Sequence, residues 1–382
     1  MNRDPESCTH EPASDDAPYR RDTMKRAAGT GRVCSLACGL LLATQLPAAN
    51  HAVILQYHHF GDDTPPSTSV TLAQFDRHLD HLAQNDYRVW PLERVVQQLR
   101  AGAELPDKVV AISVDDAYLS VYREAFPRLR ARGWPFTVFV SPGPVDRHSP
   151  GQMTWEQMRE MSRHGVSFAN HSLDHAHLIR QGPNEDTAAW RARVRTDIVQ
   201  TQQRLEQELG QAPRLFAYPF GEYHAALKTL LGELGFVAFG QQSGPASHNS
   251  DFLALPRFAM AVPYAALEDF RVKLQTLPLP VVEAQPDDPL LPVAESRPRL
   301  RVQLQAGDYL ADSLSCYVSG QGRTPVRWLD EAQSAFEVQA ARPLAIGRSR
   351  YNCTARARQG DCYYWYSHLW IRRHPDGSWQ RE

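Results

Sequence analysis

Residues 110–118 read VAISVDDAY, an apolar run that ends abruptly in two carboxylates, Asp115 and Asp116. The run has the length and β-branched content of a buried strand. In folds built on parallel strands, active sites form where the strands end. Because neighbours on a regular strand point to opposite sides, both carboxylates can serve one site only where the strand breaks into its loop. The stretch predicts a site at a strand end or, as the plainer alternative, a helix N-cap.

Short apolar runs alternate with amphipathic helical stretches on both sides of this segment, between Val53 and Leu274. The alternation predicts an α/β fold of parallel strands and helical crossovers, as an open sheet or a barrel slightly smaller than the eightfold kind. The expected strands are 53–57, 109–114, 136–140, 166–169, 215–218, 236–239 and 253–260. The expected helices are 72–84, 92–100, 122–132, 155–163, 190–209 and 225–234.

A Pro-rich and acidic stretch, 277–298, follows and predicts a linker. Beyond it, short β-branched or aromatic runs separated by turn residues predict a small all-β, sandwich-like domain. These runs are 300–304, 313–318, 323–328, 335–338, 352–357 and 363–371. The expected division is an N-terminal extension over 1–52, an α/β domain over 53–276, the linker, and the all-β domain over 299–382.

The N-terminal extension predicts an export signal. Met24 opens a basic stretch, which is followed by an apolar run over 33–46 and by small residues at positions 48 and 49. We expect Met24 to be the true start and cleavage to fall between Ala48 and Ala52, which gives a secreted or periplasmic protein. The apolar run is shorter than the ~20 residues of a membrane span, so none is expected after cleavage. A buried N-terminal helix is the alternative.

Charge and cysteine content narrow the partners and the compartment. The formal net charge is −2, and no basic stripe is interleaved with aromatic residues, which excludes nucleic acid as a partner. Removal of the signal leaves three cysteines, Cys316, Cys353 and Cys362. An oxidising compartment permits one disulfide among them, and the sequence does not fix which pair forms it.

A second group of reactive side chains lies in residues 168–177, which read FANHSLDHAH and also follow an expected strand. The H-x-x-x-H spacing of His171 and His175 is weak by itself. Its position strengthens it, because both this motif and the carboxylate pair end strands of the same sheet. Two imidazoles and one carboxylate form a hydrolytic metal site, usually with zinc. Such a metal polarises a carbonyl and activates water, while the other carboxylate handles protons.

A third segment, residues 214–221, reads RLFAYPFG and ends a strand in Pro219 and Gly221. Proline and glycine there mark a tight turn where the backbone can approach a ligand closely. A backbone N–H in such a turn can stabilise an oxyanion. Taken alone, the segment is more often just a turn that ends a strand.

In this order, the three segments resemble the polysaccharide deacetylases, the NodB-homology group also called carbohydrate esterase family 4. The family pattern is a strand ending in Asp-Asp, then His-Ser/Thr-x-x-His, then a Pro-aromatic-Gly turn. Residues 55–60, LQYHHF, also resemble the Tyr-His start of the branch that includes biofilm poly-N-acetylglucosamine deacetylases. The resemblance spans roughly residues 53–274.

The resemblance implies a distorted (β/α)7 barrel that removes acetyl groups from an envelope or biofilm polysaccharide containing N-acetylglucosamine. It implies that Asp116, His171 and His175 hold one divalent metal ion, zinc or in its place cobalt or nickel. Asp115 is then the general base that activates water. The backbone N–H of Phe220 helps to stabilise the tetrahedral oxyanion.

Two positions depart from the family pattern. The arginine that often precedes the turn and orients the catalytic aspartate is Ala217 here, and the late histidine that often serves as general acid is absent. Arg257 is a candidate for contact with the catalytic aspartate or the substrate. His248 is a candidate for the missing acid, although a surface histidine is the plainer interpretation. His58 is expected beside the site, with a buried structural histidine as the equal alternative.

Two other functions stay open at this stage. The departures from the pattern favour a non-catalytic glycan-binding or scaffold protein, and the same metal site could serve an O-acetyl esterase. Aromatic residues in the C-terminal region could stack on sugar rings if a sheet exposes them, or form the core of a small sandwich. These residues are Tyr351, Tyr363, Tyr364, Trp365, Tyr366 and Trp370.

Overall fold

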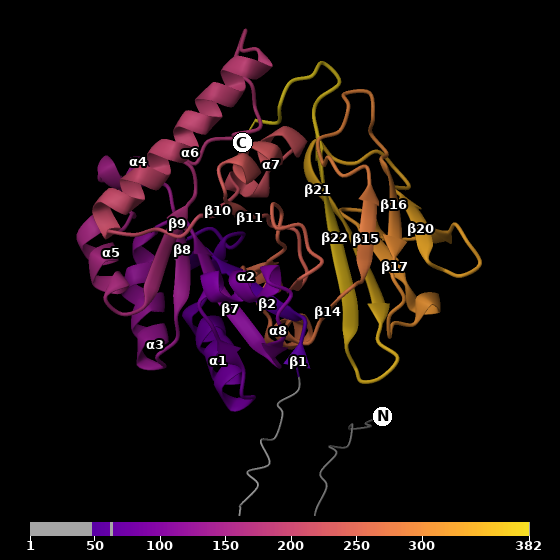
Figure 1. Cartoon of the computed structure of the whole chain (residues 1–382), viewed down its shortest axis with the longest axis horizontal. Coiled ribbons are helices and arrows are strands. Elements are labelled where there is room, and N and C mark those ends of the chain that lie inside the picture. Colours follow the sequence, from indigo (N-terminus) through magenta and orange to yellow (C-terminus); the bar gives the residue numbers. More distant parts are fainter. Residues whose placement is uncertain (1–47, 62–63, 382) are drawn as a thin grey trace, which may run out of the picture. The chain divides into compact units, whose positions relative to one another are not determined.

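The parallel strands expected from the sequence lie side by side in one sheet (Figure 1). The computed structural model describes residues 48–61 and 64–381. The strands of this sheet are β2 (His51–Tyr57), β5 (Arg88–Val89), β7 (Val109–Asp115), β8 (Phe136–Val140), β9 (Val166–Asn170), β10 (Leu215–Ala217), β11 (Val237–Phe239), β12 (Ala246–Ser247) and β13 (Phe258–Ala259). Their order is β11-β10-β9-β8-β7-β2-β12, with β13 beside β2 and β5 beside β7. Every pair is parallel except β12 with β2.

The sheet curls back on itself through the segment 252–260. The Leu255 N–H donates to the Ala238 carbonyl of β11, and Phe258 pairs in parallel with Leu55 of β2. The region is therefore a mixed α/β fold with a curled half-barrel, consistent with a NodB-like barrel. The sequence predicted a longer strand over 253–260, whereas the structure has only β13 there. Pro256 has no N–H to donate to a neighbouring strand, which accounts for the interruption.

The helices are α1 (Leu72–Gln84), α2 (Leu92–Arg100), α3 (Phe126–Ala131), α4 (Pro142–Asp146), α5 (Trp155–Ser162), α6 (Thr187–Leu209), α7 (Ala225–Glu233) and α8 (Leu267–Leu274). The bounds predicted for α1 and α2 are confirmed. Thr71 caps α1, because its side chain accepts the Gln74 N–H and the Gln74 side chain accepts the Thr71 N–H. Neither α4 nor α8 was expected from the sequence, because both are short and lack a clear amphipathic period.

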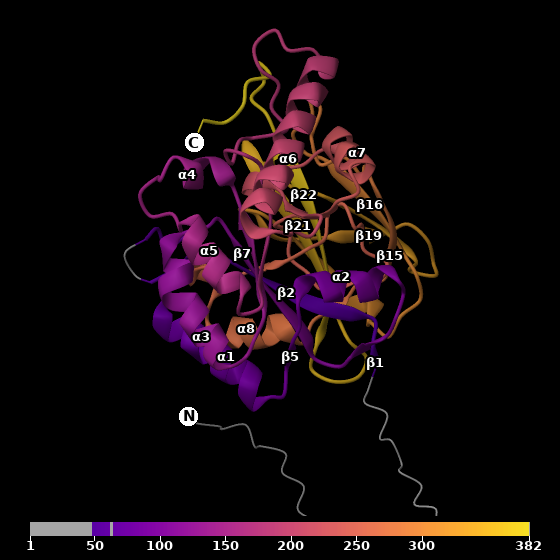
Figure 2. The ribbon, with the colours of Figure 1, turned by 60° about the vertical axis from the view of Figure 1, so that its left-hand side comes forward.

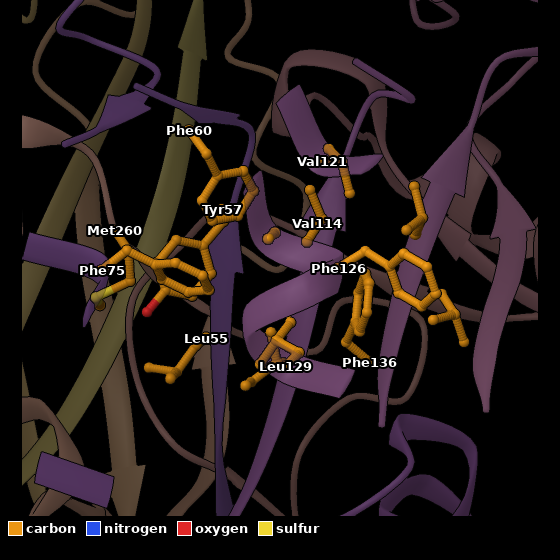
Figure 3. Packing of buried hydrophobic residues seen from close by; sticks show 14 of the residues in the cluster. Leu55, Tyr57, Phe60, Phe75, Val114, Val121, Phe126, Leu129, Phe136 and Met260 are labelled. Carbon is orange, nitrogen blue, oxygen red and sulfur yellow. The ribbon is translucent and has the colours of Figure 1, made fainter. Parts of the chain in front are cut away.

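Both faces of the curled sheet are buried, as expected for parallel strands covered by helices. Alternate residues of β2 divide between two clusters. Leu55 and Tyr57 pack with Phe75 of α1 and Phe126 of α3 (Figure 3), while Ile54 packs with α2. Figures 1 and 2 show α1, α3 and α5 grouped on one side of the strands.

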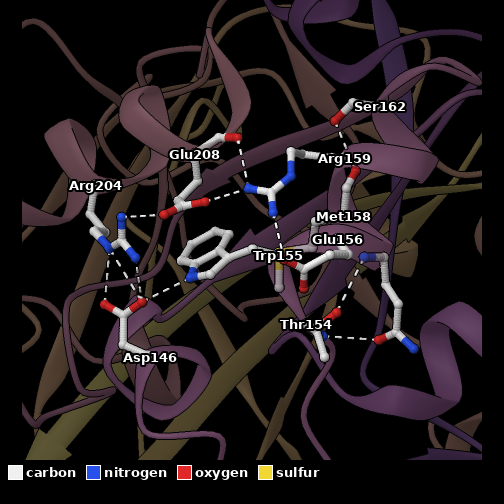
Figure 4. Close-up of polar contacts among 10 residues, drawn as sticks. Asp146, Thr154, Trp155, Glu156, Met158, Arg159, Ser162, Arg204 and Glu208 are labelled. Carbon is white, nitrogen blue, oxygen red and sulfur yellow. Dashed lines mark hydrogen bonds and ion pairs between the residues drawn. The ribbon is translucent and has the colours of Figure 1, made fainter.

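Hydrogen bonds and ion pairs connect α5 and α6 to Asp146 at the end of α4 (Figure 4). Asp146 accepts hydrogen bonds from the Trp155 indole (2.8 Å) and from Nη2 of Arg204 (2.8 Å). Arg204 also contacts Glu208, one turn further along α6. Thr154 caps α5 in the same way that Thr71 caps α1. These contacts fix the helices that flank β8 and β9.

Two sheets are formed by the strands of the C-terminal region. These strands are β14 (Leu277–Pro278), β15 (Val281–Gln285), β16 (Arg299–Leu304), β17 (Ser315–Val318), β18 (Gly322–Thr324), β19 (Val326–Trp328), β20 (Ala335–Gln339), β21 (Gly347–Arg356) and β22 (Tyr363–Arg372). The sheet orders are β14-β22-β21-β17-β18 and β15-β16-β20-β19. Both sheets contribute to one buried cluster, which includes Phe336, Val338, Tyr351 and Trp370.

The stretch predicted as a linker contains β14 and β15, so part of it is a strand rather than irregular chain. Each is the edge strand of its sheet, where a proline interrupts no hydrogen bonds on its outer side. The expected run over 323–328 is likewise divided at Pro325 between β18 and β19, which belong to different sheets. The division of the chain into domains at 277–298 stays a prediction.

One disulfide joins Cys316 of β17 to Cys353 of β21, which are direct neighbours across the two strands. Cys362 is a free thiol. Tyr351 and Trp370 are fully buried, so these two aromatic residues belong to the core. The predicted export signal, including Met24 and the apolar run, lies outside the described residues. Among the residues that the structure does describe, no helix is long and apolar enough to cross a membrane.

Four short strands pair in two small sheets beside these. They are β1 (Ala48–Ala49) with β6 (Leu105–Pro106), and β3 (His59–Phe60) with β4 (Ser69–Val70). The β3–β4 pair holds the chain just beyond the end of β2, next to His58.

Candidate metal centre

Asp116, His171 and His175 lie together beyond the carboxyl ends of β7 and β9. One ligand atom from each falls within 4.8 Å of the others. The Nε2 atoms of both histidines lie 3.7 Å from Oδ1 of Asp116. Two imidazole nitrogens and one carboxylate oxygen are the donor set of a hydrolytic zinc site, so these side chains fit a divalent metal. The structure thus brings together the three residues that the sequence analysis proposed as metal ligands.

His171 is already oriented as a ligand by the neighbouring strand. Its Nδ1 lies 2.7 Å from the Ala217 carbonyl at the end of β10. This contact places the proton on Nδ1 and leaves the Nε2 lone pair facing Asp116. Burial lowers the pKa of His171 to about 3, so the ring is neutral and able to bind a metal. Burial also raises the pKa of Asp116 to about 6, a shift that a nearby cation would oppose.

The backbone around this cluster is strained. Asp116, Ser172, His175 and Phe220 have φ angles between 54° and 64°, a left-handed region that such residues rarely adopt. The turn after β9 is held in place because the Asn170 side chain accepts the Ser172 N–H at 3.0 Å. Strain of this kind persists only where the surroundings enforce it, and it gathers at functional sites.

The second carboxylate, Asp115, is fully buried and held on both oxygens. Arg257 donates to Oδ1 at 2.6 Å and to Oδ2 at 2.7 Å, and Gln56 of β2 donates to Oδ2 at 2.7 Å. Arg257 has no exposed surface either. Burial alone would raise the pKa of Asp115, but the Arg257 guanidinium outweighs it and holds the pKa well below its usual range. Asp115 is therefore a fixed anion.

Arg257 therefore makes the contact with Asp115 that the sequence pattern would assign to an arginine before the turn. The position before the Pro-Phe-Gly turn is Ala217, yet an arginine from the far end of the curled sheet reaches the same aspartate. The Nε of Arg257 donates to the Gly240 carbonyl at 3.0 Å, which fixes the guanidinium after β11. Gln56 is a residue that the sequence did not single out. Its position two residues before His58 is the only sequence signal.

The two accessory histidines occupy opposite ends of β2. His58 follows the carboxyl end, and its Nε2 lies 3.9 Å from Oδ2 of Asp115. His248 follows β12, whose Ser247 pairs with His51 at the amino end of β2. A strand of that length separates the two ends by roughly 20 Å. The structure brings His58 to the cluster and leaves His248 exposed on a distant loop.

Phe220 lies at the centre of a tight turn beside the metal ligands. Its ring stacks on His177 with the ring centres 3.8 Å apart and meets His175 edge-on. His177 contacts Glu222 at 2.7 Å, and Glu222 also receives Arg348 of β21 at 3.1 Å. The turn around Phe220 is therefore supported by a residue of the C-terminal sheets, a contact that sequence spacing could not predict.

The arrangement defines an α/β protein with a candidate hydrolytic metal centre at its strand ends. Residues 102–239 match the model of the polysaccharide deacetylase family. This finding confirms the resemblance of the three segments. The matched range contains Asp115, Asp116, His171, His175 and Phe220.

Two known proteins that are similar to this chain in sequence or structure are an N-deacetylase and IcaB. The poly-β-1,6-N-acetyl-D-glucosamine N-deacetylase of Escherichia coli K12 is 26% identical over 257 residues, which cover 58% of this chain and 38% of that protein. The structure of IcaB from Ammonifex degensii is 26% identical, with a TM-score of 0.50, and covers 58% of this chain and 96% of that one. The chain thus spans well under half the length of the Escherichia coli relative.

A third neighbour supports the fold alone. The Streptococcus pyogenes deacetylase PplD is 24% identical, with a TM-score of 0.52, and the match covers 58% of this chain and 98% of that one. All three comparisons leave about two fifths of the chain uncovered.

Proposed function

We propose that the protein is a metal-dependent hydrolase that removes N-acetyl groups from an envelope or biofilm polysaccharide containing N-acetylglucosamine. The observation that carries the proposal is the convergence of Asp116, His171 and His175 beside a second buried carboxylate. The names of the Escherichia coli relative and its homologues in Staphylococcus aureus support this substrate class. Export by the N-terminal signal and a separate all-β domain over 299–382 are parts of the same proposal.

Zinc held by Asp116, His171 and His175, or cobalt or nickel in its place, would polarise the acetyl carbonyl and lower the pKa of water. Asp115 takes the proton from the attacking water. Arg257 and Gln56 restrict that carboxylate to one orientation, which is what a positioned base requires. The Phe220 N–H donates to the oxyanion from a turn whose strained geometry is fixed in advance.

The departing amine needs a proton, and His58 is placed to deliver it. Its Nε2 lies 3.9 Å from Oδ2 of Asp115, and its side chain is 18% exposed, so the ring lies between the cluster and solvent. In this assignment, His58 takes the role of the missing late histidine. Arg257, through its contact with Asp115, takes the role of the arginine that is missing at position 217. These two assignments weaken the case for a non-catalytic glycan-binding protein as far as it rests on the missing arginine and histidine.

Acetate release from poly-N-acetylglucosamine and chitin oligomers, with and without a chelator, tests the proposal. We expect chelator-sensitive release that falls at least about a thousandfold in Asp115→Asn, since a base and its partners act together. Asp107→Asn, exposed before the other end of the same strand, is the matched control and keeps full activity. No release by metal-loaded protein would overturn N-deacetylation, and release from O-acetyl esters alone would assign an esterase instead.

A further inference from the structure

A cavity of about 330 Å³ lies between the loop that follows β11 and the strands β14, β15 and β22. Its volume falls in the range of small-molecule sites. The metal ligands do not line it, so it is separate from the candidate metal centre. Two of the C-terminal aromatic residues, Trp365 and Tyr366, line it.

Trp365 provides an aromatic wall that is held in one position. Its indole N–H donates to Oγ of Ser243 at 3.0 Å, and its ring meets Phe258 edge-on at 5.6 Å. The side chain remains partly exposed and lines the cavity. An indole fixed in this way offers an apolar face with a polar edge, on which the C–H face of a sugar ring can pack.

The inner wall carries a buried polar atom that lacks a partner. His368 is 8% exposed, and its Nδ1 lies 3.2 Å from the Tyr366 hydroxyl. Its Nε2 is buried and has no hydrogen-bond partner among the described residues. Burial lowers the pKa of His368 to about 4, so the ring is neutral and can exchange hydrogen bonds with a hydroxyl group. An unpaired buried nitrogen is costly, so a ligand hydroxyl group that came within hydrogen-bond distance of it would be stabilised.

Most charged groups of the cavity are engaged with one another. Lys228 contacts Asp251 and Asp287, each at 2.8 Å, and the fourth, Glu283 on the exposed strand β15, accepts from the Gln285 amide at 2.8 Å. The other polar groups are hydroxyl, amide and imidazole side chains, among them Ser367 and Asn249. An aromatic wall beside such groups is suited to a sugar unit rather than to an ion.

A backbone hydrogen bond links the lining of the cavity to Arg257, which contacts the candidate base Asp115. The Arg257 N–H donates to the carbonyl of Gln242, which lines the cavity, while the Arg257 side chain holds Asp115. We propose that the cavity is a saccharide-binding subsite, which takes a hexosamine unit of the polymer away from the unit that reacts. This inference rests on the proposed function for the identity of the polymer.

Val282 offers a way to block the cavity without disturbing the fold. It lies on the edge strand β15, lines the cavity and is 58% exposed, so Val282→Trp adds bulk at the mouth. Val272→Trp on α8 is the matched control, since Val272 is also exposed (42%) and does not line the cavity. Equal thermal midpoints of the two variants would establish that both are folded.

Calorimetric binding of a β-1,6-linked N-acetylglucosamine pentamer to the metal-loaded Asp115→Asn protein gives the decisive measurement. We expect Val282→Trp to weaken binding about tenfold, or 1.4 kcal/mol, and Val272→Trp to leave it unchanged. His368→Phe, which removes the unpaired nitrogen from the inner wall, is expected to weaken binding as well. Equal dissociation constants for Val282→Trp, Val272→Trp and the parent, or no binding by the parent, would overturn the proposal.

Kinetic measurements of acetate release distinguish a failure of this inference from a failure of the proposed function. With Asp115 intact, Val282→Trp should raise KM for the pentamer and leave acetate release from a monosaccharide substrate unchanged. If no variant or wild type released acetate, the proposed function would fail, and the binding comparison would still decide the cavity.

Discussion

The α/β region and the C-terminal sheets both join a carboxylate to arginine, in opposite surroundings. Asp115 and Arg257 meet at the end of β7 with no exposed side-chain surface, and two hydrogen bonds join them. Glu337 of β20 contacts Arg299, Arg301 and Arg327, which are 50–65% exposed. One buried arginine serves Asp115, whereas three exposed arginines share Glu337, whose own side chain is only 8% exposed.

The difference shows where each region depends on charge. A buried ion pair gains little net free energy when it forms, but removing one partner leaves the other charge buried and uncompensated. A surface network is screened by water and salt, so each contact contributes little. Left-handed backbone gathers at the α/β strand ends, at Asp116, His175 and Phe220, whereas among the described non-glycine residues of the C-terminal sheets only Gln333 adopts it. We infer that the α/β strand ends are fixed for chemistry and the exposed sheet charges are not.

Loss of Arg257 should have the largest effect on stability. Arg257→Met is expected to lower the free energy of unfolding by about 3–5 kcal/mol, because Asp115 then stays buried without its cation. Urea denaturation measures the change. The double variant Arg257→Met with Asp115→Asn should recover part of the loss, since the uncompensated charge is gone. A loss below about 1 kcal/mol in the single variant would show that the pair is solvated in solution.

The disulfide gives the C-terminal sheets their own strong constraint. Replacing both Cys316 and Cys353 by alanine should cost about 3 kcal/mol, since their 37-residue separation closes a sizeable loop in the unfolded chain. Thermal or urea unfolding of protein made under oxidising conditions measures it. Cys362→Ala is the control, expected within about 0.5 kcal/mol of wild type. Equal stability of the double variant would mean that the constraint is unimportant to this region.

The sequence predicted the fold where local pattern governs structure. The helices α1 and α2 have their expected bounds because an amphipathic period defines each of them, and Thr71 caps the first. The two-residue strands β12 and β13 carry no readable period and depend on their neighbours. The candidate metal ligands could be grouped from the sequence because Asp116 and His171 directly follow two strands of one sheet. Arg257 and Asp115 are 142 positions apart in the chain. Their contact depends on the curl of the sheet, so the sequence could make Arg257 a candidate but could not predict the pairing.

Each region contains a buried histidine with a lowered pKa, so both regions are expected to lose stability as the pH falls. Burial lowers the pKa of His78 in α1, as of His368 in β22, to about 4, against 6.5 for a free ring. Between those pH values the unfolded chain binds a proton that folded His78 does not, so stability falls as the pH falls from 6.5 towards 4. His78→Gln should flatten this slope by up to about 1.4 kcal/mol per pH unit.

Urea unfolding at a series of pH values measures the slope. His248→Gln, on an exposed loop, is the control and should leave it unchanged. An equal slope in His78→Gln and wild type would show that His78 titrates normally, and would remove burial as the cause of acid sensitivity in the α/β region.

The smallest effect is expected at the surface network of the C-terminal sheets. Glu337→Gln keeps the shape of the side chain and removes its charge, so only the attraction to three exposed arginines is lost. We expect a change below about 1 kcal/mol, and a smaller one at high salt, because exposed pairs are screened. Urea unfolding at two salt concentrations measures both. A loss as large as that of Arg257→Met would contradict the division between the regions, since the number of arginine partners would then matter more than their burial.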